Sequence, residues 1–162
     1  MHGKRIQSQR AYEKRLARMA AQPNIQVLRR YGQHKGSTTY GHVMAVARMS
    51  GTIARKLHIP VEERDLMRGA LLHDYYLYGE DRQEQMGAYK HGTSHAETAV
   101  KNAQRRFDLT PREKNIIWSH MWPLNLTHVP KSREAWIVCA ADKICAVQEM
   151  VFHRSHKEDT NV

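Results

Sequence analysis

The spacing of apolar positions along the chain predicts helices and no strand of useful length. Near the N-terminus Tyr12, Leu16 and Met19 recur at the interval of one helical face. The same periodicity continues in six later segments, about 24–31, 39–58, 61–74, 94–107, 110–120 and 132–153. Because strict apolar and polar alternation is missing, we expect an all-α fold, a single bundle of about six helices with a basic N-terminal helix.

Turn and capping residues separate these helices. Thr38 or Thr39 is placed to cap the helix that follows, and the run Thr110-Pro111-Arg112-Glu113 has the pattern of a capping box. Residues 75–92 and 123–131 lose periodicity, so we expect two loops there that shape a pocket.

The length and composition fit one soluble domain. The chain has 162 residues, a normal size for one domain with a real core. We divide it into a basic helical segment packed on the body (1–35), the helical bundle (36–155) and a polar tail (156–162). No apolar run approaches the ~20 residues of a membrane span, and the polar N-terminus does not resemble a signal peptide. We therefore expect a cytoplasmic protein.

The positive charge is concentrated at the N-terminus. Residues 1–35 hold nine Lys or Arg and one acid, whereas residues 36–162 hold seventeen bases and fifteen acids. A basic segment of this kind raises the hypothesis of nucleic-acid binding. The apolar stripe beside Arg10, Lys14 and Arg18 favours instead a helix that lies on the core with its cations in water.

Histidine is the unusual component of the composition, with eleven residues. Placed on their predicted helices, His42, His73 and His120 point where the apolar stripes point, and Asp142 does the same on the last helix. Asp74 directly follows His73. We expect six other histidines to be surface residues: His2, His34, His58, His128, His153 and His156. The two cysteines, Cys139 and Cys145, are expected to fill the core.

The inward carboxylates need compensation. A buried carboxylate costs several kcal/mol unless it is paired or bound to a metal ion, and no Lys or Arg lies in the facing stripes. Imidazole and carboxylate together are ligands for Mn, Fe, Co, Ni or Zn. The set of Asp74, Asp142 and the inward histidines therefore predicts a metal site between facing helices.

These residues resemble the HD-domain superfamily of metal-dependent phosphohydrolases. The match comprises Tyr40-Gly41-His42-Val43, Ala70-Leu71-Leu72-His73-Asp74, Lys90-His91-Gly92-Thr93-Ser94-His95, Trp118-Ser119-His120 and Ala140-Ala141-Asp142-Lys143. The resemblance covers about residues 38–150, and it implies an α-helical bundle, in agreement with the periodicity.

The resemblance also implies the site. His42, His73, Asp74 and Asp142 would hold one divalent ion, and Asp74 would bridge to a second. His120 fits one of the two further ligand positions, and either His91 or His95 fits the other, with His95 closer to the helix that would direct it inward. One or two ions are expected, with Mg as a further candidate metal.

The implied reaction is hydrolysis of a phosphoester or phosphoanhydride bond in a small phosphorylated substrate, with a nucleotide as first candidate. Asp74 would act as general base, and Lys143 would either contact the substrate phosphate or remain a surface cation. Two alternatives stay open: an HD-fold di-iron oxygenase with nearly the same ligands, and a helical protein that binds nucleic acid through its basic segment.

Overall fold

The computed structural model describes residues 3–32, 37–77 and 88–158, with side chains omitted at 88–93 and 152–158. Within these ranges the chain is helical and contains no named strand, which confirms the all-α fold. The elements are α1 (Gln9–Ala20), α2 (Pro23–Gln26), the 3₁₀ helix η1 (Val27–Arg30), α3 (Thr39–Lys56), α4 (Glu63–Leu72), α6 (Ala88–Gln104), α7 (Pro111–Ser119) and α8 (Arg133–Glu158).

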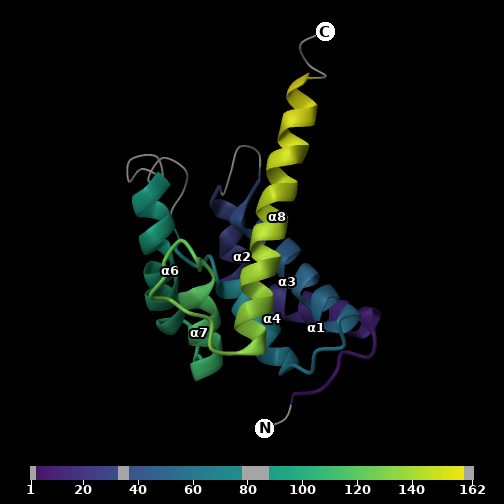
Figure 1. Cartoon of the computed structure of the whole chain (residues 1–162). Coiled ribbons are helices and arrows are strands. Elements are labelled where there is room, and N and C mark those ends of the chain that lie inside the picture. The colour runs from purple at the N-terminus through teal and green to yellow at the C-terminus, as the bar shows by residue number, and fades with distance from the viewer. Residues whose placement is uncertain (1–2, 33–36, 78–87, 159–162) are drawn as a thin grey trace.

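Helices α3, α4, α7 and α8 form the centre of the bundle. Helix α3 packs on α4 and α8, and α7 packs on the same two helices (Figure 1). Helix α6 lies outside α7, and α8 runs along the body and extends well beyond it (Figure 1). The buried apolar side chains between them include Val46, Leu66, Ile116 and Val138.

The predicted caps are present. The Thr38 hydroxyl accepts a hydrogen bond from the Gly41 N–H at 3.1 Å at the start of α3. At the start of α7, Thr110 and Glu113 form the reciprocal capping box, with distances of 3.1 and 3.0 Å. These interactions satisfy backbone N–H groups that the first helical turn leaves without partners.

The basic N-terminal helix lies on the core. Tyr12, Leu16 and Ala20 of α1 are buried, whereas Arg10, Lys14 and Arg18 are exposed. The Tyr12 hydroxyl donates to the Ala47 carbonyl of α3 at 2.8 Å. The apolar stripe therefore faces the body and the basic stripe faces solvent, as the periodicity predicted.

Two helices extend well beyond their predicted limits. Helix α6 begins at Ala88, so residues 88–92 of the predicted loop are helical; residues 78–87 lie outside the described part of the chain. Helix α8 ends at Glu158, five residues beyond the predicted end at His153. Both extensions are rich in polar residues, which carry no apolar periodicity for a sequence prediction to detect. Among the described residues, no helix has the length and apolarity that crossing a membrane requires.

Candidate metal centre

Five helices bring six titratable side chains to one buried position. They are His42 in the first turn of α3, His73 and Asp74 at the end of α4, His95 in α6, His120 at the end of α7 and Asp142 in α8. Each of the six is buried, with at most 9% of the residue exposed. His73 is the C-cap of α4 and His120 is the C-cap of α7, so both histidines lie where their helices end.

Asp74 lies between two groups of histidines. Its Oδ2 atom is 3.5 Å from His73 Nε2 and 3.7 Å from His42 Nε2. Its Oδ1 atom is 3.4 Å from both His95 Nε2 and His120 Nε2. One carboxylate thus presents a different oxygen to each pair of imidazoles.

Asp142 completes the first group. Its Oδ1 atom is 3.1 Å from His42 Nε2 and 3.6 Å from His73 Nε2. The ligand atoms of His42, His73 and Asp142 are close enough to share a metal ion, and so are those of His73, Asp74 and His120.

Hydrogen bonds on the outer edge fix the rings. His73 Nδ1 donates to the Ala70 carbonyl and His120 Nδ1 donates to the Ile117 carbonyl, each at 2.7 Å. Since a carbonyl only accepts, each Nδ1 carries the proton, and each Nε2 directs a lone pair at the centre unless the ring is protonated twice.

His42 is held in a different way. Its Nδ1 atom is 2.9 Å from Glu149 Oε1, a carboxylate of α8. The sequence analysis missed Glu149. Its position seven residues after Asp142 places it on the same face of α8, two turns along, but does not by itself bring it to His42.

The donor set fits a divalent cation. His73 Nε2 is buried and has no hydrogen-bond partner among the described residues. His95 Nε2 and His120 Nε2 are 2.8 Å apart, and Asp74 Oδ1 lies 3.4 Å from both, so three donor atoms surround one position. Nitrogen and carboxylate donors in this arrangement are typical of first-row transition-metal sites.

The two carboxylates are held in their charged form. Burial alone would raise the pKa of Asp74, but the surrounding His73, His120 and His95 hold that pKa well below its usual value. Burial likewise opposes ionisation of Asp142, yet its hydrogen bond with His42 and the nearby His73 ring keep its pKa well below the usual value.

The pKa values of His42 and His120 are shifted in opposite directions. Burial lowers the pKa of His42, but its hydrogen bonds to Asp142 and Glu149 outweigh burial and raise the pKa to about 10. Burial dominates at His120 and lowers its pKa. The protonated form of His42 is therefore favoured in the absence of a metal, and a divalent cation can replace the Nε2 proton because metal binding displaces ligand protons.

The remaining predicted site residues lie as follows. Lys143 donates from Nζ to the His120 carbonyl at 2.7 Å, and its side chain is 43% exposed. Of the two alternatives for the ligand position beside His120, His95 joins the cluster, and the His91 side chain lies outside the described residues.

One histidine prediction is wrong. His128 is buried, with 5% exposed, because the Trp118 ring lies over it with centroids 3.9 Å apart. His58 is exposed as predicted. The side chains of His2, His34, His153 and His156 lie outside the described part of the chain. Both cysteines are buried, as expected.

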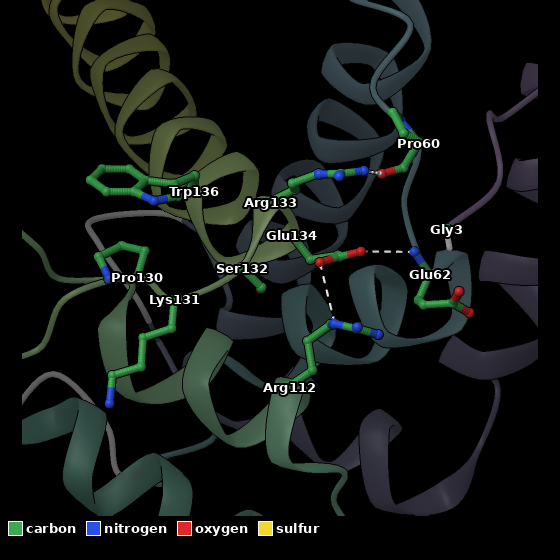
Figure 2. A pocket seen from close by; sticks show the side chains of 10 residues that line it. All are labelled: Gly3, Pro60, Glu62, Arg112, Pro130, Lys131, Ser132, Arg133, Glu134 and Trp136. Carbon is green, nitrogen blue, oxygen red and sulfur yellow. Dashed lines mark hydrogen bonds and ion pairs between the residues drawn. The ribbon is translucent and has the colours of Figure 1, made fainter. Parts of the chain in front are cut away.

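A cavity of about 570 Å³ lies away from this cluster, at the start of α8 (Figure 2). Three of its charged side chains, Arg112, Arg133 and Glu134, have partners. Glu134 accepts from the Glu62 N–H at 2.8 Å and lies 3.4 Å from Arg112 Nε, and Arg133 donates to the Pro60 carbonyl at 3.2 Å (Figure 2). These bonds anchor the helix that carries Asp142 nine residues further on.

Comparison with known proteins assigns most of the chain. The sequence model of the HD domain family matches residues 39–147, a span that contains all six clustered side chains and Lys143. Neither the curated proteins nor the solved structures contain a match.

Proposed function

The chain belongs to the HD-domain family of metal-dependent phosphohydrolases, and on that premise we propose that it hydrolyses a phosphoester or phosphoanhydride bond in a small phosphorylated substrate. A nucleotide is the first candidate. The single observation that carries this proposal is the position of Asp74 between the two pairs of histidines.

The cluster divides into two ligand sets. His42, His73 and Asp142 would hold one divalent ion together with Oδ2 of Asp74. His95 and His120 would hold a second ion together with Oδ1 of Asp74. Mn, Fe, Co, Ni and Zn all suit these donors, and Mg is a further candidate. Bound divalent ions supply Lewis acidity toward phosphate and lower the pKa of water toward ~7.

Asp74 is the proposed proton acceptor at this centre. Its carboxylate stays ionised because the imidazoles around it hold its pKa low. In the proposed reaction the oxygen of a water molecule attacks phosphorus, the bond from phosphorus to the leaving oxygen breaks, and Asp74 takes the proton of that water.

Lys143 is the proposed contact for the substrate phosphate. Its ammonium group lies beside the His120 carbonyl and 3.8 Å from Asp142 Oδ2, at the edge of the buried cluster. Because the Lys143 side chain is partly exposed, it can reach a phosphate oxygen while the metal-ligand side chains remain buried. A charge-assisted hydrogen bond of this kind fixes the anionic end of a substrate.

The test is a substrate panel with the protein loaded separately with Mn²⁺, Co²⁺, Ni²⁺ and Fe²⁺. We expect metal-dependent hydrolysis of nucleotides, measured by chromatography of the shortened nucleotide and by assay of inorganic phosphate, and none with protein treated with a chelator. Turnover that requires iron and consumes oxygen would instead assign the chain to the di-iron oxygenases of the same fold. No hydrolysis of any substrate in the panel with any ion would contradict the proposal.

A further inference from the structure

Glu149 lies outside the ligand set but contacts one of its members directly. Its Oε1 atom is 2.9 Å from His42 Nδ1, on the side of the ring that faces away from Asp74 and His73. Its other oxygen, Oε2, is buried and has no hydrogen-bond partner among the described residues. Burial of an ionised carboxylate oxygen destabilises the folded protein unless the charge is paired with a neighbouring cationic group.

The position of His42 in its helix explains why this contact is needed. His73 and His120 are C-caps, where the last carbonyls of a helix lack intrahelical partners and can accept from Nδ1–H. His42 is the fourth residue of α3, where the first turn offers surplus N–H donors instead of free carbonyls. An acceptor for His42 Nδ1–H must therefore come from another element.

Helix α8 provides that acceptor. Asp142 and Glu149 are seven residues apart, so they lie on one face of α8, and each contacts a different nitrogen of the His42 ring. Asp142 approaches Nε2 at 3.1 Å and Glu149 approaches Nδ1 at 2.9 Å. The ring is thus held between two carboxylates of the same helix.

We infer that Glu149 is a positioning residue for the metal centre, which holds His42 with its proton on Nδ1 and its Nε2 directed at the ion. A carboxylate that accepts from the outer nitrogen of a ligand histidine fixes the tautomer and raises the basicity of the ring. This inference rests on the metal site of the proposed function, and it concerns metal affinity and not the identity of the substrate.

The test compares the Mn²⁺ affinity of wild-type protein with that of Glu149→Ala, Glu149→Gln and Gln148→Ala, by titration calorimetry. We expect Glu149→Ala to weaken Mn²⁺ binding roughly 10–100-fold. Glu149→Gln should lose less, because its amide oxygen can still accept from Nδ1–H. Gln148→Ala alters an exposed side chain on the same turn of α8 and should bind as wild type.

A second readout separates positioning from a general loss of structure. In Zn²⁺-loaded wild-type protein, nitrogen NMR of the imidazoles should show the His42 Nδ1–H resonance shifted by its hydrogen bond to Glu149. Glu149→Ala should lose that hydrogen-bond shift while circular dichroism retains the helical content. Glu149→Ala that binds Mn²⁺ with wild-type affinity would overturn the inference alone. Wild-type protein that binds no Mn²⁺ would contradict the proposed function as well.

Discussion

The Nε2 atoms of His95 and His120 lie only 2.8 Å apart in the centre of the bundle. His120 donates its Nδ1 proton to the Ile117 carbonyl, and burial lowers its pKa, so its Nε2 directs a lone pair toward His95. A proton or a metal cation between the rings relieves the repulsion of two facing lone pairs. Asp74 Oδ1 at 3.4 Å from both nitrogens favours the cation, because the three donors then surround one position.

Removal of the shared carboxylate is expected to disable the whole centre. Asp74→Ala takes an oxygen from each ligand set and also removes the proposed proton acceptor, so metal content and hydrolysis should both fall to background. Metal content is measured by elemental analysis and hydrolysis by phosphate release. Asp108→Ala removes an exposed carboxylate and is the matched control. Full activity in Asp74→Ala would refute its role.

Lys143 should affect the substrate and not the metal. Lys143→Ala removes the ammonium group at the edge of the centre, and we expect the KM to rise about tenfold or more while metal content is unchanged, since hydrogen bonds to charged groups contribute about 1.5–3 kcal/mol. Lys143→Arg keeps the positive charge and should therefore raise the KM less than Lys143→Ala. Lys114→Ala, exposed on α7, controls for the loss of one positive charge. An unchanged KM in Lys143→Ala would leave Lys143 as a surface cation.

Metal removal should lower the thermal stability. Ions that bind only the folded protein stabilise it by about 2.7 kcal/mol at a free concentration of 100 Kd. For a chain of this size that corresponds to a change in Tm of roughly 5–10 °C. We expect a chelator to lower the Tm by this amount and excess Mn²⁺ to restore it. In the Asp74→Ala variant the chelator should have no effect, and a shift of the same size there would point to another metal site.

The contact of α4 with α7 should tolerate no added methyl group. A Cβ atom at Gly69 would lie 2.6 Å from Ile116 Cδ1, and Ile116 is fully buried. We expect Gly69→Ala to lower the free energy of unfolding by about 1–3 kcal/mol, despite the better helix propensity of alanine.

Gly41 provides the matched control for this substitution. The nearest atom to a Cβ there is Thr38 Oγ1 at 3.6 Å, an ordinary contact. Gly41→Ala in α3 should therefore be neutral or stabilising by up to about 1 kcal/mol. Denaturant unfolding measures both variants, and equal effects at the two positions would contradict the packing argument.

Helical periodicity was sufficient to predict much of the cluster. His42 and Asp142 belong to long helices with clear apolar stripes, so their inward direction follows from 3.6 residues per turn. His95 was not decided by spacing, because the segment before it lacks periodicity and the start of α6 was predicted six residues too late.

Interactions between distant segments were beyond the sequence analysis. Glu149 belongs to a polar turn of α8, and only the packing of α8 against α3 brings it to His42. His128 lies in a loop that the sequence pattern predicts to be exposed, and the Trp118 ring that covers it comes from α7. In both cases the partner is fixed by tertiary packing, which local patterns do not encode.

The most direct test of a two-ion centre is elemental analysis of wild-type protein and its His120→Ala variant, both purified without added metal. The account predicts two transition-metal equivalents in the wild type and about one in His120→Ala, because only the set formed by His95, His120 and Asp74 Oδ1 is disrupted. No metal in either protein, with none bound after dialysis against Mn²⁺, Co²⁺, Ni²⁺ or Fe²⁺, would contradict it.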